Sequence, residues 1–150
     1  MSAGAELFEA ESWLKNTLAA GTVLCALIGG TATPRIYSEF VPQGGTVPAV
    51  IISEAGSEDE FPVTGTPNIT NCRFRVRAVV QDTSYSGAAA IMAQVQPLLG
   101  GKRGTVLSGT VPILHVDSCI RVTPFRYPET LGGLQYRHYG AEYSLWVQNP

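Results

Sequence analysis

Residues Ile69–Gln81 carry the clearest strand signal in the chain, an alternation of apolar and polar side chains. Successive side chains of a β-strand point to opposite faces of a sheet, so the alternation predicts one buried face and one polar face. The apolar set is Cys72, Phe74, Val76, Ala78 and Val80. The polar set is Arg73, Arg75 and Arg77, and such a face needs water, carboxylates or phosphates because an unpaired buried charge is costly.

Other segments supply helices to cover the apolar face. Amphipathic spacing predicts helices over residues 5–19, 23–28 and 87–99, and β-branched or alternating runs predict strands over 35–37, 47–52, 105–107, 111–123 and 135–147. The segments 54–68 and 125–133 contain prolines and glycines and are expected to be connections. We therefore predict an α+β fold, with a mainly antiparallel sheet of about four main strands and helices packed on one face. The chain, residues 1–150, has the size of one domain.

The predicted connection 54–68 contains an acidic cluster. Loops of this length are often functional, although a solvated acidic loop explains the composition equally well. In the first case the acids suit a basic surface, such as the arginine face of a neighbouring copy. Glu142, on the polar face of the last predicted strand, is the candidate partner of an arginine on the adjacent strand. The predicted interface residues are Arg73, Arg75, Arg77, Glu58, Asp59, Glu60 and Glu142.

Composition argues against several classes of protein. The formal net charge is −2, which gives no support to a protein that grips nucleic acid by its overall charge. The chain has no apolar run near the length of a membrane span, and its first residues carry acids where a secretory signal would carry bases. The three cysteines are widely spaced, as expected of free thiols in a reducing cytoplasm. Only 15% of the residues are charged, which suggests that neighbouring subunits cover part of the surface.

The sequence contains few patterns that would indicate catalysis or metal binding. The sequence has no G-x-S-x-G, phosphate-binding loop, G-x-G-x-x-G or H-E-x-x-H motif. His115 and Asp117 share a predicted strand face and could act as base and orienter, but no nucleophile is spaced to join them. Cys72, Cys119, His115 and His138 lack the spacing of zinc ligands. We predict no catalytic residue, no cofactor and no metal.

Residues 27–53 read LIGGTATPRIYSEFVPQGGTVPAVIIS. They predict a helix end at a Gly-Gly pair, a short strand, a Pro-Gln-Gly turn and a strand buried on both faces. In this order the motifs resemble the phage tail-completion family, which includes the tail terminators of long-tailed phages. The matching residues are Leu27, Gly29, Gly30, Arg35, Ile36, Tyr37, Pro42, Gln43, Gly44, Pro48, Val50, Ile51 and Ile52. The downstream order of strand, helix, strand and strand fits the family as well.

The resemblance implies a structural virion protein. Members of the family assemble as a ring, commonly a hexamer, on the head-proximal end of the tail tube, where they stop tube polymerisation and dock to the head connector. The implied partners are other copies of the chain, the tail tube protein and the head-tail connector protein. DNA passes through the ring lumen, and neither a membrane nor sequence-specific nucleic acid is involved. The implied location is the tail or neck of the virion, assembled in the cytoplasm of the bacterial host.

Two alternatives to a tail terminator remain open. The first is a neighbouring neck or head-tail connector component, which the sequence separates poorly from a terminator. The second, of a different class, is an enzymatic or small-ligand-binding α+β domain, for which the sequence shows no site.

Overall fold

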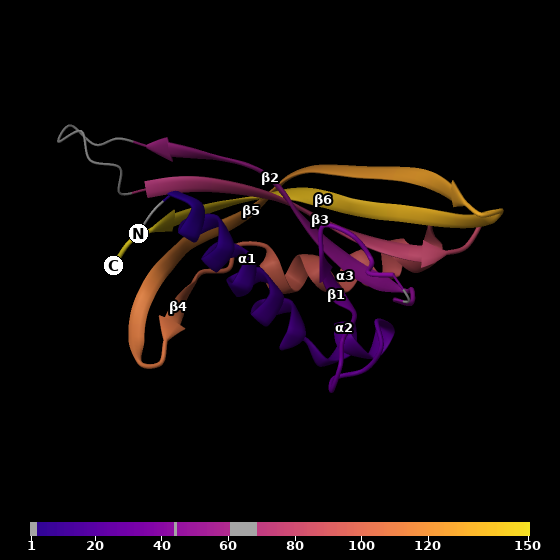
Figure 1. Ribbon diagram of the computed structural model, residues 1–150, viewed down its shortest axis with the longest axis horizontal. Helices are drawn as coiled ribbons and strands as arrows, with labels where there is room; N and C mark the ends of the chain where they lie inside the picture. Colours follow the sequence, from indigo (N-terminus) through magenta and orange to yellow (C-terminus); the bar gives the residue numbers. More distant parts are fainter. Residues whose placement is uncertain (1–2, 44, 61–68) are drawn as a thin grey trace.

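A computed structural model of the protein describes residues 3–43, 45–60 and 69–150. In these residues a single sheet has the strand order β1-β2-β3-β6-β5-β4 (Figure 1). All neighbouring strands are antiparallel except β1 and β2, which are parallel. The elements are α1 Ala3–Ala19, α2 Thr22–Leu27, β1 Ile36–Ser38, β2 Ala49–Glu60, β3 Ile69–Gln81, α3 Ser86–Leu99, β4 Gly104–Ser108, β5 Val111–Leu131 and β6 Leu134–Gln148.

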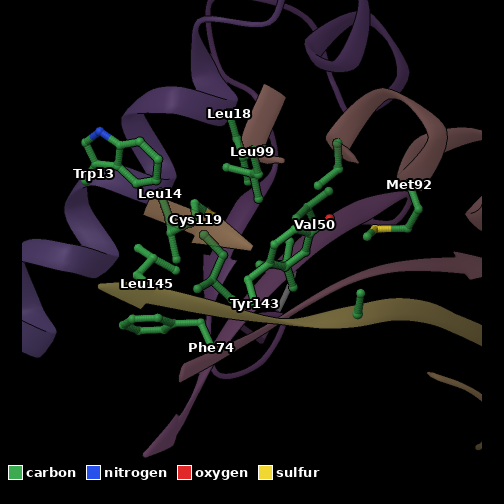
Figure 2. Close-up of a cluster of buried hydrophobic side chains, with 14 of the residues drawn as sticks. Trp13, Leu14, Leu18, Val50, Phe74, Met92, Leu99, Cys119, Tyr143 and Leu145 are labelled. Atoms are coloured by element: carbon green, nitrogen blue, oxygen red, sulfur yellow. The ribbon is translucent and has the colours of Figure 1, made fainter. Parts of the chain in front are cut away.

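The three helices gather on one face of the sheet and form the main core with it (Figure 1). Leu14 and Leu18 of α1, four residues apart, meet Leu99 of α3 above Tyr143 and Leu145 of β6 (Figure 2). All five side chains are fully buried. Burial of a side chain of this size contributes roughly 1.5–3 kcal/mol, so this interface holds the helix layer on the sheet.

The predicted α+β class and the placement of helices on one face agree with the structure. The predicted sheet of about four main strands is too small, because two short strands complete its edges. β1 has three residues and β4 has five, and each pairs with only one neighbour. The sheet is also mixed, since β1 runs parallel to β2.

β2 is longer than predicted. The expected strand over 47–52 continues to Glu60 across a register shift between Glu54 and Gly56, so residues 54–60 belong to a strand and not to a loop. The first half of β3 offers a partner to every residue of this acidic segment except Ala55, and this pairing overrides the weak strand propensity of the segment. The rest of the predicted connection, residues 61–68, lies outside the described residues.

β5 is also longer than predicted, since it runs through the expected connection to Leu131. Pro124 and Pro128 fit because β4 pairs only with residues 111–116, which leaves the second half of β5 at the edge of the sheet. A proline at an edge need not donate a ladder hydrogen bond. Gly132 and Gly133, both with positive φ, then form the two-residue turn into β6.

Two register shifts in β5, after Val116 and after Arg121, change which side chains face the core. The sequence alternation placed Cys119 on the face opposite to Leu114 and Val116. In the structure all three are buried, and Ile120 is 53% exposed. An extra residue at a bulge reverses the inward and outward parity beyond it, which explains the difference.

Candidate interaction surface

The sheet face opposite the helices is called the open face here. It carries the three arginines predicted from the alternation in β3. Arg73 and Arg75 are exposed, and Arg77 is half-buried. Arg75 lies directly across from Glu142 of β6, with 3.9 Å between Nε and the Glu142 Oε2. The predicted pairing of Glu142 with an arginine of the neighbouring strand is therefore present. An exposed pair at this distance contributes little, typically about 0–1 kcal/mol.

Arg77 is tied to its own chain. Its Nη1 donates to the Ser53 Oγ over 3.2 Å, and its Nη2 donates to the Glu39 carbonyl oxygen over 3.3 Å. Its Nε is buried and has no hydrogen-bond partner among the described residues. Arg73 and Arg75 are therefore the two arginines of β3 that are available to a partner.

The acidic residues predicted for the interface lie at one end of β2. Glu58, Asp59 and Glu60 pair with Asn71, Thr70 and Ile69 of β3. Glu58 is exposed. Asn71 precedes Arg75 by four residues, or about 13 Å along a strand, so the acidic end and Arg75 occupy separate parts of the sheet.

A hollow of about 450 Å³ lies at the other end of the open face. His138 lines it and is 5% exposed, with its Nε2 2.9 Å from the Glu129 Oε2 and its ring stacked 4.4 Å from that of Tyr127. Burial lowers the pKa of His138 from its ordinary 6.5 and Arg77 acts in the same direction, against the opposing effect of Glu129. Among the described residues, those that line this hollow include no serine or cysteine.

Sequence reasoning missed the pairing of His138 with Glu129 because it treated residues 125–133 as a connection. The usable signal was Gly132-Gly133. Counting outward from a two-residue hairpin turn places Tyr127 opposite His138, as observed.

The structure does not bring His115 and Asp117, the candidate base and orienter, together. The His115 Nδ1 lies 3.2 Å from the Thr105 Oγ1, and the Asp117 Oδ1 accepts a hydrogen bond from the Gln148 Nε2 over 3.1 Å. Among the described residues, no hydrogen bond or ion pair joins the two. Each of these side chains therefore serves a contact between neighbouring strands.

The three cysteines, all within the described residues, are buried and are not joined in a disulfide. Burial raises the pKa of Cys119 to about 12, which keeps its thiol neutral. No group of three or more His, Cys, Asp or Glu residues in the described ranges is placed to hold a metal ion. In the same ranges no helix combines the length and the apolar character that a membrane crossing requires.

The motif residues of segment 27–53 have structural roles. Gly29 and Gly30 adopt positive φ after α2, a conformation that glycine accepts without strain. The Arg35 Nε donates to the Pro48 carbonyl oxygen and its Nη1 to the Thr46 Oγ1, each over 2.9 Å. Arg35 thus ties the residues before β1 to the entry of β2, which explains why these motifs occur in this order.

The family whose description is Tail completion protein gp17 matches residues 14–118, well over half of the chain. The chain belongs to this family. The resemblance read from residues 27–53 is therefore confirmed. The match to the tail completion family runs from α1 to residue 118 of β5, so the rest of β5 and all of β6 lie beyond it.

The fold of this tail completion protein also occurs in a phage-like particle. A chain of the virion of a native gene transfer agent particle is 16% identical, with a TM-score of 0.61 over 89% of this chain and 91% of that chain. A second solved chain, 14% identical over 89% of this chain and 94% of its own, has a TM-score of 0.43 and carries no argument. No curated protein sequence gives a significant match. Membership of the family identifies a structural component of a phage or phage-like virion.

Proposed function

We propose that this tail completion protein forms a ring, a hexamer by its family resemblance, that caps the head-proximal end of the tail tube. The ring ends tube polymerisation and joins the tail to the head. Its partners are other copies of the chain, the tail tube protein and the head-tail connector protein, and DNA passes through its lumen. Assembly takes place in the cytoplasm of the bacterial host.

The open face is the observation that carries this proposal. Arg73 and Arg75 are exposed on this face, and Ile120, which is 53% exposed, lies on the same face across β6, since both Ile120 and Arg73 pair with Ser144. Mixed apolar and arginine-rich surfaces of this kind are suited to protein contacts, and arginine is enriched in such interfaces. A subunit that ends a tube needs complementary surfaces and no titrating active site.

The acidic end of β2 supplies a complementary surface. We propose that Glu58, Asp59 and Glu60 of one copy approach the arginines of the next copy. Within one chain Asn71, the partner of Glu58, lies about 13 Å along β3 from Arg75 and about 7 Å from Arg73, so Arg75 is the arginine for which contact between copies is favoured. Both strand edges near these residues are protected against direct strand pairing, by acids on β2 and by Pro124 and Pro128 on β5. Contacts through side chains are therefore favoured.

Native mass spectrometry of the purified protein tests the ring directly. We expect one closed oligomer at low ionic strength. At high salt the fraction of smaller species should increase, because exposed charge pairs are screened. Negative-stain electron microscopy should then show rings with a central hole. A protein that stays monomeric over the accessible concentration range would contradict the proposal.

A further inference from the structure

A second basic surface lies on the helix side of the sheet, on the hairpin formed by β5 and β6. The guanidinium carbon of Arg126 lies 5.0 Å from the centroid of the Tyr85 ring, and that of Arg137 lies 5.6 Å from the same centroid. Both distances are within the range of a cation–π contact. Two cations thus converge on one neutral ring. We call Arg126, Tyr85 and Arg137 the arginine–tyrosine cluster.

The described part of the chain provides no carboxylate for this cluster. Within the described ranges Arg137 donates only to the Tyr136 carbonyl oxygen and the Gln135 side chain, and Arg126 makes no hydrogen bond or ion pair. Asp82, in the same loop as Tyr85, has its Oδ1 occupied by the backbone N–H groups of Thr83 and Ser84. Two like charges without an anion form a surface that an acidic partner would stabilise.

Register places the cluster on the helix side. Arg126 is opposite Tyr139 of β6, which packs against the main core, and Arg137 is two residues from Tyr139 on the same strand. Glu129 of the same hairpin is paired with Tyr136 and therefore belongs to the open face. The cluster and the open-face arginines are thus separate surfaces, on opposite sides of one sheet.

The opposite end of the helix layer carries the complementary charge. α1 begins beside the chain termini, while the β5–β6 turn lies at the far end of the long axis (Figure 1). Glu9 of α1 is half-buried and makes no hydrogen bond or ion pair within the described residues. Phe8 beside it is 65% exposed. A hollow of about 340 Å³ lies next to Arg121, between α3 and β5. It is lined mainly by small and apolar side chains, which suit the ring of a phenylalanine such as Phe8.

We propose that the arginine–tyrosine cluster of one copy binds Glu9 of the next copy, with Phe8 packing beside it. The inference rests on the proposed ring. Rotational symmetry gives every copy in a ring the same orientation, and the proposal places the long axis of each copy along the circumference, so that helix-side groups at one end of a copy meet helix-side groups at the other end of its neighbour. This geometry selects Glu9 over Glu58, which shares the open face with Asn71.

A charge swap tests the contact. Arg126→Glu is the main variant because Arg126 is exposed and makes no hydrogen bond that folding needs. We expect its dissociation constant for ring formation to rise about tenfold or more at low salt, and by less at high salt. The double variant Glu9→Arg with Arg126→Glu should recover most of the loss. Arg103→Glu, an exposed arginine elsewhere, is the matched control and should change the constant by less than about threefold.

Each other outcome is informative. Wild-type rings together with normal Arg126→Glu rings would overturn this contact and leave the proposed function standing. A monomeric wild type would overturn both. Loss of rings without recovery in the double variant would exclude Glu9 as the partner. If Arg126→Glu keeps its rings but loses binding to a short duplex DNA that the wild type binds, the cluster serves phosphate and the proposal is wrong.

Discussion

Gly140 of β6 lies directly across from Arg77 of β3, and a β carbon at Gly140 would stand 2.6 Å from the Arg77 Cα. It would also collide with the Val76 carbonyl oxygen. We therefore expect Gly140→Ala to destabilise the fold by about 2 kcal/mol or more, because neither obstacle is a flexible side chain. For a chain of this size the melting temperature should fall by roughly 4–8 °C.

Gly87→Ala is the matched control for this variant. A β carbon at Gly87 would lie 3.7 Å from a Val80 methyl group, an ordinary contact, and the residue is in α3. We expect the change to be neutral or to stabilise by up to about 1 kcal/mol, since alanine favours helix. Equal melting temperatures for the wild type and Gly140→Ala would show that β3 and β6 can separate locally.

Acidic pH should weaken the fold through His138. Burial lowers its folded-state pKa below the ordinary 6.5, so in the window below about 6.5 the unfolded chain binds a proton that the folded chain does not. Stability is therefore lost as the pH falls through that window. Urea unfolding at about pH 7.5 and about pH 5.5 should show a smaller difference for His138→Gln than for the wild type.

The variant Glu129→Gln provides a second test that the pKa of His138 causes the loss of stability in acid. The Glu129 carboxylate raises the pKa of His138, so its removal lowers that pKa further and should extend the loss of stability to lower pH. A Glu129→Gln protein that is less sensitive to acid than the wild type would contradict this assignment.

The cysteines should be unreactive while the protein is folded. Cys25, Cys72 and Cys119 are all buried, and burial raises the pKa of the Cys119 thiol to about 12. Because the thiolate is the reactive form, we expect alkylation on the order of 100-fold slower in the folded protein than in urea. Rapid labelling of Cys119 in the folded protein, located by peptide mass spectrometry, would show that the helix layer opens.

The strand β3 was predictable because residues 71–78 alternate between polar and apolar side chains and the apolar face meets the helices. The bulges of β5 were not, because no local residue type marks the extra position that turns Cys119 inward. Pro124 and Pro128 indicated a connection, and their place in a strand depends on β4 ending early. Such features are set by the neighbouring strands and not by the segment itself.

Some residues of the candidate surfaces could likewise be predicted from the sequence, and others could not. Arg73, Arg75 and Glu142 were predictable because strand alternation fixes their face and adjacent strands bring opposite charges together. The cluster of Tyr85, Arg126 and Arg137 was not, because Tyr85 comes from a loop before α3 and Arg126 from a segment predicted to be a connection, while Arg137 lies in the last predicted strand. Its formation depends on tertiary packing between these segments.

Arg75→Glu should weaken the ring more than it weakens folding. Arg75 is exposed and its pair with Glu142 is long, so we expect a loss in stability of about 1 kcal/mol or less. A reversed charge at a subunit contact costs several kcal/mol. Native mass spectrometry and thermal melts separate the two effects. Adding Glu142→Arg restores an opposite pair within the chain and should restore stability without restoring the ring.

Recovery of the ring in that double variant would mean that Arg75 acts only within its own chain. Unchanged oligomer populations in the single variant would mean that the open-face arginines form an ordinary solvent-exposed surface. Either outcome would remove the main support for the proposed contact between the open face and a neighbouring copy.

The length of tails on particles assembled without this protein is the most direct test of the central claim. Electron microscopy should compare particles made with the chain, without it, and with it resupplied. If the protein caps the tube, its absence should give tails of variable and excessive length that are not joined to heads, and resupply should restore uniform joined tails. Tails of normal length attached to heads in its absence would contradict the account.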